Sequence, residues 1–206
     1  MLAELFEEAE LANDRITAGC DEAGRGPLAG PVVAACCVLP DDFPFEILND
    51  SKKMSEKERL EVEEIIKEKA TSYAVSAISN EVIDEINILN ASMEAMRLSY
   101  LKVRRKVDVE LLLVDGNKCP DVDIMVEAVV KGDQKVPQIM AASILAKNER
   151  DRIMLLADRI FPEYDYKKHK GYPTKEHRER IKKYGSNIIT RTSYHIKDSD
   201  EPTLPL

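Results

Sequence analysis

The chain lacks the features that would mark a membrane, secretory or modular protein. No stretch of its 206 residues approaches the roughly 18–20 consecutive apolar residues of a membrane-spanning helix. Residues 1–15 are acidic, where a secretory signal peptide would be basic. Internal repeats, low-complexity tracts and long Gly/Ser linkers are also missing. With 44% hydrophobic and 33% charged residues, the composition predicts one globular domain over residues 1–206, without membrane contact.

Cysteine is scarce, and the four cysteines lack the spacing of a metal-binding motif. The four cysteines form no CxxC pair, and two of them are adjacent within the apolar run VVAACCVL; they are Cys20, Cys36, Cys37 and Cys119. This pattern is typical of buried free thiols in a reducing compartment, and it disfavours both a disulfide framework and a zinc site. We therefore expect a cytoplasmic protein.

The net charge of −8 disfavours nucleic-acid binding at first sight, but the charge is unevenly distributed. Residues 1–100 carry 9 Lys and Arg against 21 Asp and Glu, whereas residues 101–206 carry 21 against 17. Within residues 147–183 the count is 12 against 7. A basic face can therefore exist on an acidic protein, and binding through it would be moderate and salt-sensitive. A solvated surface of mixed charge explains the same counts.

Hydrophobic patterning predicts an α/β fold. Strands are predicted at residues 16–21, 31–39, 71–79, 109–116 and 124–133, and helices at 2–12, 55–69, 80–87, 91–105, 137–159 and 174–184. Ser55 and Glu58 form a capping box at the start of one helix, and Asn90 is expected to cap another. This order implies a central mixed five-stranded sheet flanked by helices, with a small helical C-terminal extension over about residues 160–206.

Four acidic residues stand at the predicted strand ends, next to a glycine or a turn: Asp21, Glu22, Asp115 and Asp133. Strand ends at one edge of a sheet can bring carboxylates together, and without His or Cys they form a site suited to Mg²⁺ or Mn²⁺. Two such ions can activate water and stabilise the leaving oxygen of a phosphodiester. Neighbours in a strand point to opposite faces, so Asp21 and Glu22 share a site only if the chain bends there or one contributes a carbonyl. Taken singly, each acid is more often a turn former or a helix cap.

The segment DEAGRGPLAGP at residues 21–31 holds three glycines around one arginine. GRGPLAG misses the GxGxxG dinucleotide fingerprint by one position, and the GxxxxGKS of a phosphate-binding loop is absent. The glycines indicate a backbone that approaches a ligand closely, with exposed N–H groups and one fixed cation, Arg25. A tight hairpin turn would explain the glycines, but not the arginine or the preceding acid pair.

The block AGCDEAGRGPLAGPVVAA closely resembles the signature of type 2 ribonucleases H, specifically the bacterial ribonucleases HII. Further segments match in order: NDSKKMS (49–55), LLVDGN (112–117), KGD (131–133), AASILAK (141–147), RDR (150–152) and HKGYPTKEH (169–177). The resemblance covers about residues 16–192. It implies a ribonuclease H-like fold and endonucleolytic hydrolysis 5′ of ribonucleotides, in RNA/DNA hybrids and at single ribonucleotides embedded in duplex DNA. The implied products carry 3′-hydroxyl and 5′-phosphate ends, and the implied roles are DNA replication and ribonucleotide excision repair.

The resemblance also implies roles for individual residues. The catalytic metal ligands, for two Mg²⁺ or Mn²⁺ ions during catalysis, would be Asp21, Glu22, Asp115 and Asp133. The 2′-hydroxyl of the ribonucleotide would be read through the backbone of Gly24, Arg25 and Gly26, and Tyr172 would stack beside the RNA–DNA junction. The positions that contact phosphate in the family correspond here to Lys52, Lys53, Ser143 and Lys147. Asp151 shares a helix face with the last two and is expected to form a structural ion pair. The substrates would be bound by a monomer.

Some features leave alternatives open. The family's HRxSF near the C-terminus stands here as TRTSY (190–194), with Thr190 for histidine and Tyr194 for phenylalanine, so the role of this segment is open. Ribonuclease HIII, the sister type, prefers longer hybrids, typically carries an extra N-terminal domain and lacks the arginine of GRG. Here Arg25 is present and only residues 1–15 precede the first predicted strand. A non-catalytic nucleic-acid-binding module of the same fold is the alternative from another class, and the presence of all four acids favours the enzyme.

Overall fold

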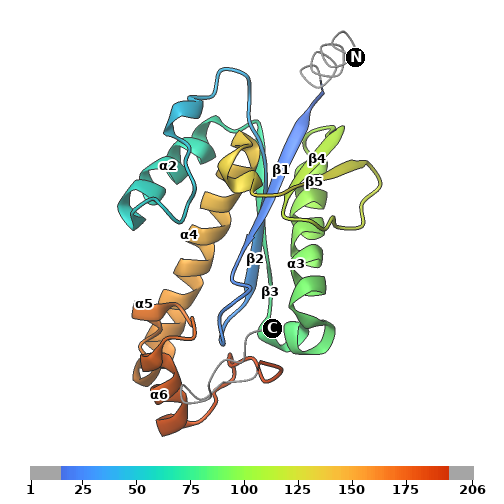
Figure 1. The fold of residues 1–206 in the computed structure, drawn as a ribbon. Helices are drawn as coiled ribbons and strands as arrows, with labels where there is room; N and C mark the ends of the chain where they lie inside the picture. The colour runs from blue at the N-terminus through green and yellow to red at the C-terminus, as the bar shows by residue number, and fades with distance from the viewer. Residues whose placement is uncertain (1–14, 195–206) are drawn as a thin grey trace, which may run out of the picture.

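The computed structural model describes residues 15–194, in which a five-stranded sheet is flanked by helices (Figure 1). The strands are β1 (Thr17–Ala23), β2 (Val32–Val38), β3 (Ser72–Ile78), β4 (Leu111–Asp115) and β5 (Met125–Val129). Their order across the sheet is β3-β2-β1-β4-β5. β2 pairs antiparallel with β1 and β3, whereas β4 pairs parallel with β1 and β5. The predicted mixed five-stranded sheet is confirmed.

The helices are α2 (Glu56–Lys69), α3 (Asn80–Arg104), α4 (Pro137–Ile160), α5 (Tyr166–His169) and α6 (Lys175–Tyr184). α2 begins at the predicted capping box, in which Ser55 accepts from the backbone N–H of Glu58 and the Glu58 carboxylate accepts from that of Ser55. The helix predicted at residues 2–12 lies outside the described residues. Between residues 15 and 194, no helix combines the length and the apolar character needed to cross a membrane.

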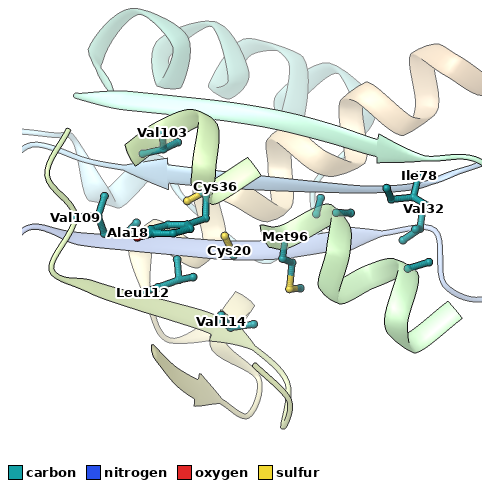
Figure 2. Packing of buried hydrophobic residues seen from close by; sticks show 14 of the residues in the cluster. Ala18, Cys20, Val32, Cys36, Ile78, Met96, Val103, Val109, Leu112 and Val114 are labelled. Carbon is teal, nitrogen blue, oxygen red and sulfur yellow. The ribbon is translucent and has the colours of Figure 1, made fainter. Parts of the chain in front are cut away.

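The two faces of the sheet are covered by different helices, because successive side chains of a strand point to opposite faces. On one face Cys36 of β2 belongs to a buried cluster with Met96 of α3 (Figure 2). On the other face Cys37 belongs to a cluster with Ile66 of α2 and Ile144 of α4. Figure 1 shows α3 on one side of the sheet and α2 and α4 on the other. This burial on both faces explains why β2 is apolar along its whole length.

β1 and α4 lie in close contact where α4 begins. A Cβ atom placed on Gly19 of β1 would stand 2.3 Å from the carbonyl carbon of Gln138, so only glycine fits there. This close approach brings the first half of α4 beside the strand that carries Asp21. The spacing of β1 and α4 therefore sets how far the helix stands from the predicted acids.

The predicted helical extension forms at the far end of α4, where α5 and α6 pack (Figure 1). A third apolar cluster joins them to the glycine-rich turn after β1; it contains Leu28, Ala29, Met154, Ala157, Tyr164, Tyr166 and Ile181. Two short helices that the sequence analysis did not predict, Pro162–Tyr164 and α5, make the connection to α6. The C-terminal segment is thus packed against the turn that the sequence marks as a ligand-contacting loop.

The two helices predicted at residues 80–87 and 91–105 form one run, α3, with a kink at Asn87, where φ is 67°. The expected cap at Asn90 is wrong, because the Oδ1 atom of Asn87 accepts from the N–H of Asn90 at 3.1 Å. Both asparagines are good caps. The packing of α3 decides which of them leaves helical geometry.

The strand predicted at residues 124–133 ends at Val129. Lys131 adopts the left-handed conformation with φ 58°, and the 3₁₀ helix Gly132–Gln134 follows. The prediction that Asp133 ends a strand is therefore wrong in detail, because the apolar run VEAVV continues the strand pattern past the point where the chain turns.

Three of the four cysteines are buried free thiols, as expected: Cys20, Cys36 and Cys37. The expected burial of Cys119 is wrong, since its side chain is exposed. It lies in the loop between β4 and β5, beyond the apolar strand that carries the pattern.

Two histidines stack within the C-terminal segment, with ring centroids 4.3 Å apart and ring planes 18° from parallel. The Nδ1 atom of His169 accepts from the N–H of Gly171 at 3.2 Å, so its Nε2 carries the proton that bonds the carbonyl of Tyr164 at 2.9 Å. The Nδ1 atom of His177 bonds the carbonyl of Tyr172 at 3.0 Å. Burial lowers the pKa of both rings, that of His177 to about 4. Two neutral rings therefore support the segment that carries Tyr172.

Acidification should weaken this C-terminal segment through His177. Its pKa of about 4 in the folded protein lies well below that of an unfolded histidine, near 6.5, so the unfolded chain binds the proton more readily. The stabilisation is complete above about pH 6.5 and falls toward pH 4, by about 2 kcal/mol after allowance for screening. The Tm of His177→Gln, measured between pH 7 and pH 4.5, should fall less steeply than that of the wild type. Equal slopes for the two proteins would contradict this role.

Candidate active site

Three of the four predicted carboxylates converge on one point. Asp21 of β1, Asp115 at the end of β4 and Asp133 of the 3₁₀ helix each offer an oxygen within 4.8 Å of the others. β1 and β4 run parallel, so their carboxyl ends stand at the same edge of the sheet. The third acid is held there because the N–H of Asp133 donates to Oδ1 of Asp115 at 3.3 Å.

The three carboxylates are crowded, and two of them are removed from water while Asp115 is half-buried. Asp21 and Asp133 are only 4% and 3% exposed. Burial, followed by the charges of Glu22 and Asp115, raises the pKa of Asp21 well above its ordinary value. The Nζ of Lys52 donates to Oδ2 of Asp133 at 2.8 Å, and this bond raises the pKa of the lysine. Lys52 therefore brings one positive charge to three carboxylates.

Glu22 stands apart from this group of three. β1 continues through Asp21 and Glu22 to Ala23, and Glu22 lies outside the group of oxygens within 4.8 Å, although both acids line the same cavity. An oxygen of Glu22 lies 3.4 Å from Nη1 of Arg25. Burial raises the pKa of Glu22, while the charge of Arg25 acts against the rise. The bend expected after the acid pair occurs at Gly24, where φ is +104°.

The site opens into a cavity of about 230 Å³. Its wall contains nearly all of the predicted site residues: Asp21, Glu22, Gly24, Arg25, Gly26, Lys52, Asp115, Ser143, Lys147 and Tyr172. Two predicted residues are not among them. Asp133 is held behind the wall by its bond to Asp115, and Lys53 lines a separate hollow with Glu46 and Met54, with its Nζ 3.9 Å from Asp50. The fold thus brings residues as far apart in the sequence as Asp21 and Tyr172 to one cavity.

Asp151 holds Lys147 in place, which confirms the expected structural ion pair. The Nζ of Lys147 donates to both carboxylate oxygens of Asp151, at 2.6 and 2.8 Å. Arg59 of α2 pairs with the same carboxylate at 3.3 Å. Burial lowers the pKa of Lys147, and the bond to Asp151 opposes the shift. Beside this lysine, the hydroxyls of Ser143 and Ser51 share a hydrogen bond of 2.8 Å.

Asp50 is a site residue that the sequence analysis did not single out. It is buried and accepts from the N–H of Lys52 at 2.9 Å and from Nε2 of Gln134 at 3.1 Å. It thereby joins the loop that carries Lys52 to the turn that carries Asp133. Acids in loops are common turn formers, so its position gave no separate signal.

Two fully buried arginines, Arg150 and Arg191, are likewise missed by sequence reasoning. Arg150 donates at 3.0 to 3.2 Å to the carbonyls of Ala29, Pro31 and Lys170. Its guanidinium lies 5.5 Å from the ring centroid of Tyr172. A Cβ on Gly24 would stand 2.2 Å from its Nε, so the turn passes directly over this side chain. No hydrophobic pattern reveals a buried arginine, since this residue type is usually exposed.

Comparison with known proteins agrees with this geometry. The family profile of ribonuclease HII matches residues 18–197. The ribonuclease HII of Caldanaerobacter subterraneus subsp. tengcongensis is 51% identical over 191 residues, which cover 92% of this chain and 78% of the relative. That of Francisella philomiragia subsp. philomiragia is 51% identical over 179 residues, which cover 87% of this chain and 96% of the relative.

Solved structures show the same architecture. The ribonuclease H2 of Pyrococcus horikoshii OT3 aligns with a TM-score of 0.72 at 25% identity, over 87% of this chain and 94% of the other. A ribonuclease HII of Archaeoglobus fulgidus, solved in a complex with PCNA, gives 0.72 at 28% identity, over 89% and 97%. The family profile and the curated relatives together establish that this chain belongs to the ribonuclease HII family, whose members are endonucleases of the ribonuclease H kind.

Proposed function

We propose that the protein hydrolyses the phosphodiester 5′ of ribonucleotides, in RNA/DNA hybrids and at single ribonucleotides embedded in duplex DNA. The products would carry 3′-hydroxyl and 5′-phosphate ends. The convergence of Asp21, Asp115 and Asp133 carries this proposal, together with the cavity that Asp21 and Asp115 share with residues 24–26 and Tyr172. The acids suit phosphate chemistry, and an open backbone beside an aromatic ring suits recognition of a ribonucleotide.

The acidic group fits divalent cations of the Mg²⁺ or Mn²⁺ kind. Its ligand atoms are all carboxylate oxygens, which hard cations prefer. The raised pKa of Asp21 reflects burial and repulsion that a bound cation would relieve. Asp21, Asp115 and Asp133 would hold the metal, with Glu22 as a further ligand from the same cavity wall. Two bound ions would supply activation of water and stabilisation of the leaving oxygen.

The rest of the cavity wall would bind and orient the nucleic acid. Lys147 and Lys52 offer ammonium groups to phosphates, and Ser143 offers a hydroxyl. Tyr172 is 38% exposed, so its ring has a free area on which a base or sugar can stack. Apart from Lys52, these residues belong to positions 101–206, where Lys and Arg outnumber Asp and Glu. We infer that the basic contacts overcome the net negative charge locally.

We infer that the protein is a cytoplasmic monomer that acts on DNA during replication and ribonucleotide excision repair. The buried free thiols Cys20, Cys36 and Cys37 fit a reducing compartment.

Replacing Asp133 by asparagine should abolish cleavage and preserve the fold. The change removes one of three converging charges and keeps the side-chain shape, so kcat should fall at least about 100-fold, or about 2.7 kcal/mol in barrier. The measurement is kcat on a DNA duplex with one ribonucleotide, with Tm as the check on folding. Glu94→Gln is the matched control, because Glu94 pairs with Arg97 on the surface of α3, away from the cavity. Full activity of Asp133→Asn would contradict the assignment.

Chelation and product mapping test the reaction itself. With Mg²⁺ or Mn²⁺, a labelled DNA duplex with one ribonucleotide should be cut on its 5′ side, and EDTA should abolish the cut. A matched all-DNA duplex should stay intact. A duplex that is shifted on a native gel but never cut, with or without metal, would show a binding module and reject the enzyme.

A further inference from the structure

Arg191 is a buried cation whose acceptors are backbone carbonyls. It is 1% exposed, and its Nη2 donates to the carbonyl of Gly24 at 2.6 Å and to that of Pro31 at 3.1 Å. Its Nη1 donates to the carbonyl of Arg25 at 3.0 Å, and its Nε to that of Gly30 at 3.0 Å. Burial lowers the pKa of this arginine. Removing a cation from water is costly unless its N–H donors are hydrogen-bonded. Loss of any of these bonds would leave a buried donor unpaired, so the guanidinium and the carbonyls of the turn hold each other in place.

Tyr194 contacts the same turn. Its hydroxyl donates to the carbonyl of Arg25 at 2.6 Å and accepts from Nη1 of Arg191 at 3.1 Å. The guanidinium of Arg191 lies 5.0 Å from the ring centroid of Tyr194. The carbonyl of Arg25 therefore receives two hydrogen bonds, one from each of these residues.

Fixing a carbonyl also fixes the N–H of the next residue. The peptide unit is planar, and in its trans form the C=O of one residue and the N–H of the next point in opposite directions. No peptide bond in the described part of the chain is cis. The bonds to the carbonyls of Gly24 and Arg25 thus set the directions of the N–H groups of Arg25 and Gly26, which point away from Arg191.

These two N–H groups are free to contact a ligand. Within residues 15–194, no backbone or side-chain acceptor pairs with the N–H of Arg25 or of Gly26. Both residues line the cavity that contains Asp21 and Asp115. Hydrogen bonding at a carbonyl also polarises its peptide and strengthens the N–H at the other end as a donor. The cavity thus has two oriented donors beside its acidic group.

We propose that Arg191 and Tyr194 are positioning residues for ribonucleotide recognition, holding the N–H groups of Arg25 and Gly26 toward the oxygen of the ribose 2′-hydroxyl. This inference rests on the proposed function, which supplies the ribonucleotide. Neither side chain lines the cavity, so both act through the turn. Their effect is on the difference in affinity between ribonucleotide and deoxyribonucleotide, because the 2′-hydroxyl is the group that distinguishes the two.

Tyr194→Phe tests the proposal with little disturbance, because it removes one hydroxyl and keeps the ring. The measured quantities are kcat and KM on a DNA duplex with one ribonucleotide, and the inhibition constant Ki of the matched all-DNA duplex as competitor. The ratio Ki/KM reports discrimination by the 2′-hydroxyl. It should fall about two- to tenfold, the worth of one hydrogen bond, through a rise in KM with Ki unchanged. Arg191→Lys, which cannot reproduce the planar fork, should reduce the ratio further.

Tyr164→Phe is the matched control. Tyr164 also donates its hydroxyl to a carbonyl, that of Gly185 at 2.8 Å, within the C-terminal segment and outside the cavity wall. Its Ki/KM should equal that of the wild type, and Tm should show that all variants fold.

The outcomes separate this inference from the proposed function. An unchanged Ki/KM in Tyr194→Phe, or KM and Ki rising by the same factor, would overturn the positioning role while the wild type still cuts at the ribonucleotide. A wild type that fails to cut the duplex with one ribonucleotide would reject the proposed function, and this inference with it.

Discussion

When two parallel strands pair, their carboxyl ends stand at the same edge of the sheet, and Asp21 and Asp115 meet there because β1 and β4 are such a pair. Burial, and after it the charges of Glu22 and Asp115, raises the pKa of Asp21, because carboxylates brought together away from water repel one another more strongly. Folding therefore has to supply the stabilisation that this edge loses. It does so with apolar clusters on both faces of the sheet and with Lys52 at Asp133.

A second set of contacts connects the glycine-rich turn to the C-terminal segment. The N–H of Leu28 donates to the carbonyl of Gly171, and the N–H of Arg191 donates to the carbonyl of Leu28, both at 2.8 Å. The N–H of Gly30 donates to the carbonyl of Ile189 at the same distance. The glycine-rich turn, which contributes to the cavity wall, is thus held in place by backbone bonds to the C-terminal segment. Local propensity alone would leave a loop of this composition mobile.

Much of the fold follows from the sequence, because strands, caps and amphipathic helices depend on near neighbours. The capping box at Ser55 and the start of α4 at a proline are of this kind. The cap of the second part of α3 is a different case, since Asn87 and Asn90 have equal propensity and tertiary packing selects between them. The end of β5 is similar, because a turn at Lys131 requires a left-handed conformation that its side chain does not signal.

The candidate site divides in the same way. Asp21 and Asp115 could be found from strand ends. Asp133 joins them through the turn after β5, which the strand pattern does not indicate, and nothing in the pattern separates Glu22 from the group of three. Lys53 could not be distinguished from Lys52, because the direction of a loop side chain is set by its surroundings. The roles of Arg150 and Arg191 could not be found from charge patterns, since their partners are carbonyls distant in sequence. The segment TRTSY, whose role the sequence left open, supplies Arg191 and Tyr194.

The contact between Gly19 of β1 and the start of α4 affects two separate parts of the site. α4 carries Lys147 and Arg150 less than one helical turn apart, and Gly19 allows this helix to lie against β1. A side chain at position 19 would push α4 away from β1 and displace both Lys147, which lines the cavity, and Arg150, which supports the glycine-rich turn. The lysine and the support of the turn therefore depend on the same contact between strand and helix. A shift of α4 along β1 would move both of them together relative to the carboxylates at the ends of β1 and β4.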